Sequence, residues 1–523
     1  MKPVAQLPGL QIAVDGAPLP AEYGQVLDDV CVQQRLSLPT LCELTFCDPR
    51  GALAGAACML PGCALRVALE GATEPLFSGE VTALDYEYSP AGSQIVRVRA
   101  SDRLHRLRKH QPVATYIQVT LAELARELLC DHGITVAAAA DTPVQRQLVQ
   151  FRQSDLELLA DLAARYGLYF SLWGDALQVF SLEGIGAARP LTLGANLLEA
   201  RVEVNSERLC RRVDTRSWDP WLAQSHGGQV EAPRAGRQIE LELSPGAVGG
   251  SGRGAIANEI TQDDRQAEAI AQGELDRRFA AEIGLRGMAE GDPGLRPGTP
   301  VAVAGIAGPL AGRYVLTETR HTIDAERGYV TELSTLAPPA PARPGGVDVT
   351  LGLVSRVDDP QAVGRVKVSL PSCGDVESDW LGVLLPGAGK GKGLVALPDV
   401  GDTVLVLFSG GDPAQALVLG GLYGACAPPD AGVEDGAVQR YTLVTPGRQR
   451  IQLDDAKGEV RIDNRNGNFL QLSPDGVRVG NGAGSRIDMT GECLSIHSKT
   501  PLEIEAPGQS VVIRGASIDF ERA

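Results

Sequence analysis

The stretch RQRIQLDDAKGEVRIDNRNGNFLQLSPDGVRVG (residues 448–480) decides the fold of the C-terminal part of this 523-residue chain. It contains pairs of apolar residues with one residue between them, and such pairs recur every seven to ten residues up to residue 520. Side chains two positions apart in a strand point to the same face, so each pair marks a short strand with one apolar face. Glycine, asparagine, aspartate or proline separates most pairs and predicts a turn between strands.

A regular series of very short strands is typical of a β-helix or a β-prism. Each strand is too short, and its apolar face too narrow, for one chain to close a core alone. We therefore predict that residues 441–523 form a needle in which three chains wind around one axis; a single-chain β-solenoid or an additional sheet is the alternative. The predicted trimer core consists of Ile451, Leu453, Val460, Ile462, Leu470, Leu472, Val477, Val479, Ile487, Leu494, Ile496, Leu502, Ile504, Val511 and Ile513.

The composition of the whole chain narrows the class of protein. A chain of 523 residues exceeds the size of one domain, and 61 glycines and 34 prolines favour a turn-rich, mainly β fold. The net charge of −17 argues against a nucleic-acid-binding protein, which needs a basic face. No apolar run reaches the ~20 residues that span a bilayer. The first nine residues have one lysine and no apolar core, so we expect synthesis in the cytoplasm without a signal peptide.

The ten cysteines show no C-x-x-C spacing. Two pairs, Cys42 with Cys47 and Cys58 with Cys63, are five residues apart, which places the two thiols of each pair on opposite faces of a strand. We expect reduced, mostly buried cysteines, with no metal site and no cofactor in this chain.

Residues 1–340 combine strands with a few packing helices. Two helices begin with capping boxes, Thr120 with Glu123 and Ser154 with Glu157, and each carries one apolar stripe. A third helix is predicted over about residues 264–281, and its mixed charges predict a partly solvent-facing position. Proline and glycine make residues 337–346 a linker by composition.

Residues 347–424 contain five alternating strands separated by Gly-Asp and Asp-Pro turns, a pattern that fits a small closed barrel of the OB type. Residues 425–440 follow as a second linker. Its acidic residues Asp430, Glu434 and Asp435 predict a solvated hinge.

The segment of residues 347–423 resembles the OB domain of VgrG spikes and of the related spikes of contractile phage tails. The resemblance is carried by an ordered set of stretches: Gly364-Arg-Val-Lys-Val368, Pro386-Gly-Ala-Gly389, Pro398-Asp-Val-Gly-Asp402, Val404-Leu-Val-Leu-Phe408, Gly411-Asp-Pro413 and Val418-Leu-Gly-Gly-Leu-Tyr423. The N-terminal part resembles the tail-hub domain of the same family, in Ser101-Asp-Arg-Leu104, Tyr166-Gly-Leu-Tyr-Phe170, Trp218-Asp-Pro220, Gly291-Asp-Pro293 and Leu295-Arg-Pro-Gly298. Together with the needle, the resemblance covers nearly the whole chain.

The resemblance implies a mainly β protein with N-terminal tail-hub β-barrel domains and a few packing helices (1–340), a central OB-fold barrel (347–424) and a C-terminal trimeric β-helix needle (441–523). It also implies a threefold symmetric homotrimer whose hub domains, two similar barrels per chain, form a ring that docks the inner tube protein next to other baseplate proteins. Sheath contraction would then drive the spike through the target envelope, so the target membrane is met only on firing.

The resemblance further implies a tip platform at Ile518, Asp519, Phe520 and Glu521, where a PAAR-type protein, which carries its own metal, would sharpen the needle. Effector cargo is a possible further partner. Among contractile machines we favour an extracellular contractile injection system, with a type VI secretion spike and a phage baseplate hub as alternatives. The spike would thus be part of an injection particle, extracellular or in the target envelope after firing.

No stretch of the sequence indicates catalytic chemistry, and we predict a non-enzymatic protein. Lys390 and Lys392 lie in a glycine-rich segment, but no serine or threonine follows either lysine and no helix pattern follows the segment, as a phosphate-binding loop requires. The basic run of residues 103–110, with His105 and His110, predicts a solvated loop or subunit contact, and His321 predicts a structural strand residue. The alternative of a different class is a polysaccharide-active β-solenoid enzyme, which would need clustered carboxylates; Asp463, Asp488, Glu503, Glu505 and Asp519 are spread over separate predicted strands.

Overall fold

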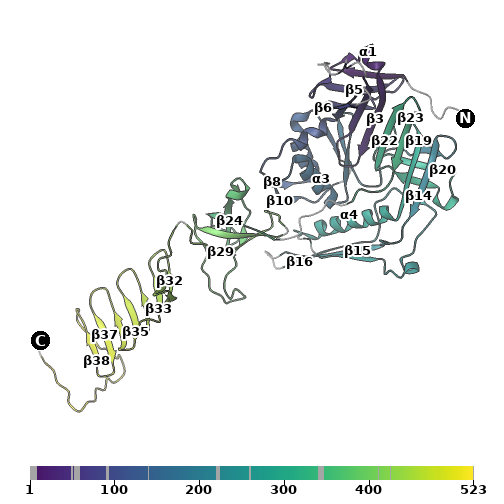
Figure 1. The fold of residues 1–523 in the computed structure, drawn as a ribbon. Helices are drawn as coiled ribbons and strands as arrows, with labels where there is room; N and C mark the ends of the chain where they lie inside the picture. Colours follow the sequence, from purple (N-terminus) through teal and green to yellow (C-terminus); the bar gives the residue numbers. More distant parts are fainter. Residues whose placement is uncertain are drawn as a thin grey trace. The chain divides into compact units, whose positions relative to one another are not determined.

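The computed structural model describes residues 9–48, 51, 53, 59–89, 94–138, 141–219, 224–257, 259, 261–339, 347–409, 411–424 and 426–521 (Figure 1). The chain forms two compact units, Met1–Gly421 and Leu422–Ala523. Most of the predicted proline-rich linker, together with Cys58 and Pro220, lies outside the described residues. The predicted boundary between hub and barrel stays a prediction, because both lie in the first unit.

One large sheet organises the first unit and joins the beginning of the chain to residues near 330. Strand β22 pairs with β3 in an antiparallel register that places Thr322 opposite Cys31, so segments almost 300 residues apart share one sheet. The strands in spatial order are β14 (Leu197–Val204), β19 (Ile283–Glu290), β23 (Gly328–Ser334), β22 (Glu318–Asp324), β3 (Leu27–Arg35), β4 (Leu41–Cys47), β7 (Gln94–Ser101), β6 (Phe77–Tyr88), β5 (Ala64–Leu69), β1 (Leu10–Val14) and β2 (Ala17–Pro18).

Four smaller sheets complete the hub. They are β10 (Gln145–Gln150) with β8 (Ala114–Val119); β11 (Tyr169–Trp173), β12 (Ala176–Phe180) and β9 (Thr135–Ala138); β13 (Arg189–Thr192), β20 (Pro300–Ala304), β21 (Gly312–Val315) and β17 (Gln238–Ile239); and β16 (Gln224–Val230), β15 (Arg212–Asp219) and β18 (Arg253–Ile256). The short helices between them are α1 (Ala21–Gly24), η3 (Arg103–Arg108), η4 (Cys130–His132), η5 (Pro245–Val248) and η6 (Gly308–Leu310).

The longer helices begin where the sequence predicts. Helix α2 (Leu121–Leu129) is capped by Thr120 and α3 (Asp155–Arg165) by Ser154, each in a complete capping box with the glutamate three residues on. Their apolar stripes pack into one core with strands β11 and β12. Helix α4 (Asp264–Glu282) lies along β15 and β16 (Figure 1). None of the helices in the described ranges combines the length and apolarity of a membrane span.

One expectation about the charged segments of the hub is wrong, the solvated loop, whereas its alternative, a subunit contact, stays a prediction. The basic run does not form a solvated loop: it folds as η3, and His105 is buried with its Nε2 atom 3.0 Å from Glu80. Helix α4 is partly solvent-facing, as predicted: Asp264, Arg265 and Glu268 are exposed, whereas Asp276 and Glu282 lie in the interior. Arg234 pairs with Asp276 and Arg237 with Glu282, so these two buried carboxylates are neutralised inside the fold.

The OB barrel is built from β24 (Val347–Arg356), β25 (Arg365–Leu370), β26 (Val376–Glu377), β27 (Leu381–Gly382), β28 (Thr403–Ser409) and β29 (Ala416–Gly421), with η7 (Pro371–Cys373) after β25. Strand β24 pairs with both β25 and β28, and a bridge from Val383 to Val418 brings the remaining edges together. Alternate side chains of these strands, among them Val366, Val368, Val404 and Val406, fill the interior. The segment with Lys390 and Lys392 is a loop that leads to β28.

His321 is a structural strand residue, as predicted, and it organises the polar interior beside β22. Its Nε2–H donates to the Leu295 carbonyl oxygen at 3.1 Å. Its Nδ1 lies 3.1 Å from the Tyr329 hydroxyl and 3.0 Å from the Thr331 hydroxyl, and these groups donate to it. Complete burial lowers the pKa of His321 to about 4, so the ring is held neutral in the folded hub.

The burial of His321 predicts a pH-dependent stability. The unfolded histidine titrates near pH 6.5, so between about pH 6.5 and pH 4 the unfolded chain binds a proton that the folded chain refuses. Stability is therefore lost as pH falls through this window, by on the order of 3 kcal/mol for this one group. We expect His321→Asn to be less stable than the parent protein at pH 7.5, and the difference in unfolding free energy to shrink towards pH 4.5.

Urea unfolding of the two proteins, measured side by side across this pH range, checks the prediction. Other titrating groups, such as buried Asp102, whose pKa burial raises to about 6, are common to both proteins and cancel in the difference. A stability difference that stays constant with pH would contradict the neutral, buried ring.

Candidate assembly interface

The second unit contains a flat antiparallel sheet of seven strands in sequence order: β32 (Arg440–Val444), β33 (Arg450–Asp454), β34 (Glu459–Asp463), β35 (Phe469–Ser473), β36 (Gly476–Gly480), β37 (Arg486–Thr490) and β38 (Leu494–His497). Each strand is four or five residues long and returns through a tight turn, as the glycine and asparagine positions predict (Figure 1). A short hairpin, β30 (Val433–Glu434) with β31 (Ala437–Val438), precedes the sheet.

The strand register places fourteen apolar side chains on one face, in two columns of cross-strand neighbours. Directly opposed residues share a face, and Ile462 opposes both Ile451 and Leu470 while Leu472 opposes both Val460 and Val477. The first column is Leu443, Ile451, Ile462, Leu470, Val479, Ile487 and Ile496, and the second is Tyr441, Leu453, Val460, Leu472, Val477, Met489 and Leu494. We call these residues the apolar face.

The apolar face is bare in the single chain. Eleven of its fourteen side chains are exposed, at 39–63% of their full accessible area, and the other three are half-buried. Burying a leucine, isoleucine or valine side chain contributes about 1.5–3 kcal/mol relative to leaving it exposed. A continuous apolar surface of this extent marks an interface with another macromolecule.

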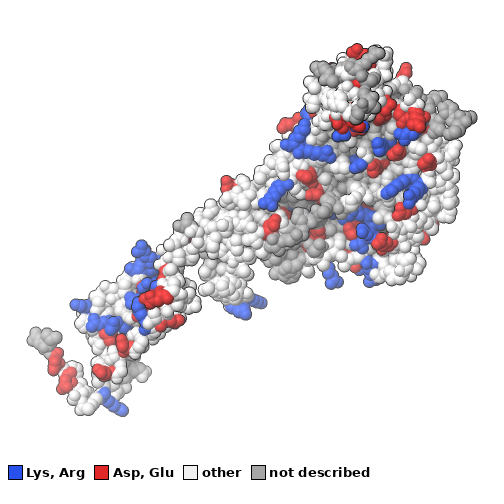
Figure 2. All heavy atoms as spheres, in the orientation of Figure 1, with Lys and Arg blue, Asp and Glu red and all other residues white. Residues whose placement is uncertain are grey.

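The opposite face of the same sheet is mainly polar, with Val444 and Phe469 as its large apolar residues, and most of its charges are paired. Arg450 Nε lies 3.0 Å from Asp463 Oδ1, and Asp488 accepts from both Arg478 and Arg486. Hydrogen bonds from these two arginines hold the pKa of the Asp488 carboxyl below its usual range, and the bond from Arg478 has the largest effect. Basic and acidic groups accordingly intermix on the C-terminal unit in Figure 2. The polar face is compatible with exposure to solvent. The contrast between the two faces therefore indicates that the apolar face is the one that a partner covers.

The linker carboxylate Asp430 does not behave as a solvated hinge. Its Oδ2 atom accepts from the Thr442 hydroxyl at 2.8 Å and from Gln452 Nε2 at 3.0 Å, and Arg440 pairs with it. These donors, led by Arg440, hold the pKa of Asp430 well below its usual range. Asp430 therefore ties the segment before the hairpin to the first two strands of the sheet.

The structure brings together most, but not all, of the residues predicted to form the trimer core. Eleven of them, from Ile451 to Ile496, lie on the apolar face, and Tyr441, Leu443 and Met489 belong to it as well. The alternation of Tyr441 with Leu443 just before the first predicted strand was the signal that the sequence offered. Within the described residues no strand follows β38, so Leu502, Ile504, Val511, Ile513 and the tip residues Ile518, Asp519, Phe520 and Glu521 lie in an exposed segment, and their roles stay predictions.

The remaining candidate residues are metal-ligand types, histidines and cysteines outside the apolar face. Among the described residues, no three or more His, Cys, Asp or Glu side chains converge to hold a metal ion. His110, the exposed histidine of the basic run, has its Nδ1 atom 2.8 Å from Asp155, which is the first residue of α3. The nine described cysteines are all free thiols, but only Cys42, Cys210 and Cys373 are buried, so the expectation that most cysteines are buried is wrong.

A β-rich hub, an OB barrel and a sheet with one uncovered apolar face define the class of an assembly protein whose C-terminal part is completed by other chains. Comparison with known proteins agrees with this class. Residues 350–423 match the type VI secretion system/phage-baseplate injector OB domain, and residues 440–500 match the phage baseplate V C-terminal trimerisation domain. Residues 5–325, more than half of the chain, match the Alg8 N-terminal domain. The protein belongs to this family, and its OB and trimerisation domains place it among VgrG-like spike proteins.

Individual proteins are similar to this chain in sequence or in fold. The type VI secretion system spike protein VgrG4b of Pseudomonas aeruginosa is 26% identical over 427 residues, which cover 71% of this chain and 52% of VgrG4b, so the chain spans about half the length of that relative. In fold, the chain is similar to the E. coli c3393 protein, a type VI secretion component (TM-score 0.52, 14% identity, covering 80% of this chain and 99% of c3393). It is also similar in fold to a chain of the Francisella PdpA–VgrG complex (TM-score 0.53, 9% identity, covering 95% of this chain and 81% of that chain).

The matched trimerisation domain coincides with the apolar face, which supports a homotrimer in which the three faces cover one another. Threefold symmetry brings three copies of every side chain of the face close to one axis. A charged residue introduced on the apolar face would thus place three charges in the buried interface of the trimer. A charged residue on the polar face would instead contact solvent and arginines.

A matched pair of neighbouring substitutions tests this placement. Leu470→Asp puts a carboxylate on the apolar face, and Gln471→Asp puts the same charge on the polar face, next to Arg461 and Arg478. An unpaired buried charge costs several kcal/mol, so we expect Leu470→Asp to raise the concentration needed for assembly at least about 100-fold and Gln471→Asp to leave it nearly unchanged. Mass photometry over a dilution series measures both; equal effects of the two substitutions would contradict the assignment of the faces.

Proposed function

We infer that this protein is the non-enzymatic trimeric spike at the tip of a contractile injection machine, where it docks the inner tube and pierces the target envelope. The observation that carries this proposal is the bare apolar face on residues that match a trimerisation domain, directly after an injector OB domain. Three such sheets wrapped around one axis make a stiff rod, and a rod at the end of a tube can transmit the axial force of a contracting sheath.

In the proposed trimer, the segment after β38 would extend the rod. Residues 501–505 and 510–514 repeat the alternation of the strands before them, with Leu502/Ile504 and Val511/Ile513 as apolar pairs. In the single chain they have no neighbouring strand to pair with, and an isolated strand is not stable in water. Assembly would supply the missing neighbours and fold this segment into the needle, with Ile518, Asp519, Phe520 and Glu521 as the platform for a PAAR-type tip protein.

Among contractile machines, we favour an extracellular contractile injection system. A type VI secretion spike is the second candidate, favoured by the likeness to VgrG4b and c3393. The Francisella complex in which one chain has a similar fold contains two proteins, PdpA and VgrG, which fits a spike that carries a further protein.

An enzyme acting on polysaccharide has less support. Its carboxylates would need to be clustered and free for acid–base chemistry. Asp463 and Asp488, the two candidates that lie in the sheet, are instead occupied by arginines of the polar face. Both residues thus have a structural role in holding neighbouring strands together.

Fractionation of cells that produce the machine tests the proposal. With a tag on this chain, we expect it to sediment with sheathed particles that are released into the medium, and a chain truncated after Arg440 to be absent from them. A chain that never sediments with a sheath would refute the spike function. Sheaths that contain the chain but stay anchored in the cell envelope would assign it to type VI secretion instead.

A further inference from the structure

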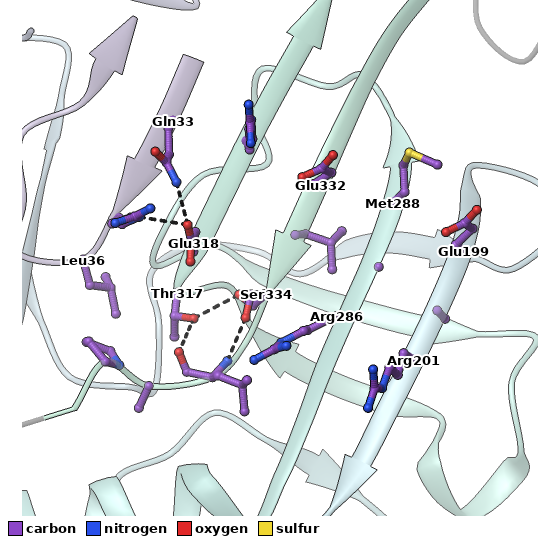
Figure 3. Close-up of a pocket in the computed structure, with 18 of the residues that line it drawn as sticks. Gln33, Leu36, Glu199, Arg201, Arg286, Met288, Thr317, Glu318, Glu332 and Ser334 are labelled. Atoms are coloured by element: carbon purple, nitrogen blue, oxygen red, sulfur yellow. Dashed lines mark hydrogen bonds and ion pairs between the residues drawn. The ribbon is translucent and has the colours of Figure 1, made fainter. Parts of the chain in front are cut away.

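A groove of about 1020 Å³ crosses the exposed face of the large hub sheet (Figure 3). Its floor is formed by β3, β22, β23, β19 and β14, and β14 is the free edge of that sheet. Leu36, Leu38, Leu336 and Pro338 line one side and make it apolar. Neither the trimerisation domain nor the injector OB domain includes any of these residues.

The strand register arranges the charged floor of the groove in two rows of cross-strand neighbours. One row runs Arg201, Arg286, Ser334, Glu318 and Arg35, and the next runs Glu199, Met288, Glu332, Arg320 and Gln33. At one end of the first row the charges are satisfied, because Glu318 accepts from Arg35 and from Gln33, each at 2.9 Å. The other end carries Arg201 and Arg286.

Arg201 and Arg286 lie directly opposite each other on neighbouring strands, and both are exposed (Figure 3). Within the described part of the chain, neither guanidinium has a carboxylate oxygen within 4.0 Å. Elsewhere the same sheet pairs its arginines with acids across strands, as Arg99 with Glu43 and Arg97 with Glu87, both at 2.9 Å. Like charges directly opposite each other destabilise a sheet, so this pair departs from the pattern of its own sheet.

Two adjacent guanidinium groups provide a forked set of N–H donors that matches carboxylates. The positive charge is local, since the chain as a whole carries −17. The apolar side formed by Leu38 and Pro338 adds a surface for hydrophobic side chains in the same groove. An extended peptide with alternating acidic and apolar side chains has the chemistry to satisfy both.

We propose that this groove, lined by Arg201 and Arg286, binds an acidic, extended segment of a partner protein of the injection machine. The carboxylates of the segment pair with the two arginines, and its apolar side chains pack against Leu38 and Pro338. The identity of the partner as a machine component rests on the proposed function; the acidic specificity of the groove rests on the register and the missing ion pairs.

Fluorescence anisotropy with the full-length protein tests the groove. The probe is a short fluorescein-labelled peptide in which glutamate and leucine alternate, and a peptide with glutamine in place of glutamate is its control. We expect the acidic peptide to bind, the glutamine peptide to bind at least about ten-fold more weakly, and added salt to weaken the acidic peptide. Arg201→Glu with Arg286→Glu should weaken its binding at least about ten-fold.

The double substitution Arg66→Glu with Arg126→Glu is the matched control, because it changes the net charge equally at two exposed arginines outside the groove. It should leave binding within about two-fold. Equal weakening by both double variants, or no binding of the acidic peptide at all, would overturn the proposal. Loss of the trimer in the groove variant alone would also overturn it, because the groove would then be a contact between copies.

Failure of the groove and failure of the spike function are distinguishable. If the chain binds the acidic peptide through Arg201 and Arg286 but never enters a sheathed particle, the groove proposal is supported and the spike function is refuted. If the chain enters particles but does not bind the peptide, the spike function is supported and the groove proposal is refuted.

Discussion

The structure depends on one constraint: a single-layer sheet cannot bury its own apolar face. Residues 440–497 form such a sheet, with fourteen apolar side chains on one side and arginine–aspartate pairs on the other. A domain needs at least two packed layers around a core, and one chain supplies only one layer here. The second layer must come from other copies, and the matched trimerisation domain supports two of them. Folding and assembly of this sheet are therefore coupled.

The hub and barrel solve the burial problem within one chain. Strands from the first 101 residues and from residues 283–334 share one sheet, and α2, α3 and α4 cover further strands and form closed cores with them. The buried histidine network around His321 and the internal pairs of α4 show that this part tolerates polar groups in its interior because each has a partner. A self-contained hub can present a stable outer surface for partners, and the groove beside Arg201 lies on such a surface.

Much of this fold could be predicted from local sequence signals. The pairs from Ile451/Leu453 to Leu494/Ile496 mark strands because their spacing of two matches the strand period and their turns contain glycine or asparagine. The capping boxes at Thr120 and Ser154 mark helix starts for an equally local reason. Features set by distant contacts could not be predicted in this way. The burial of His105 depends on Glu80, the tie at Asp430 depends on Gln452, and the meeting of Arg201 with Arg286 depends on a register between strands 85 residues apart.

The central claim is that the apolar face is covered by two further copies of the chain, and the molar mass in solution tests it most directly. Multi-angle light scattering of the purified full-length protein should give three times 55.0 kDa, about 165 kDa. A chain truncated after Arg440 should lose or weaken this assembly. A stable full-length monomer of 55.0 kDa with an ordered C-terminal sheet would contradict the account, because a bare apolar face would then persist in water without a partner.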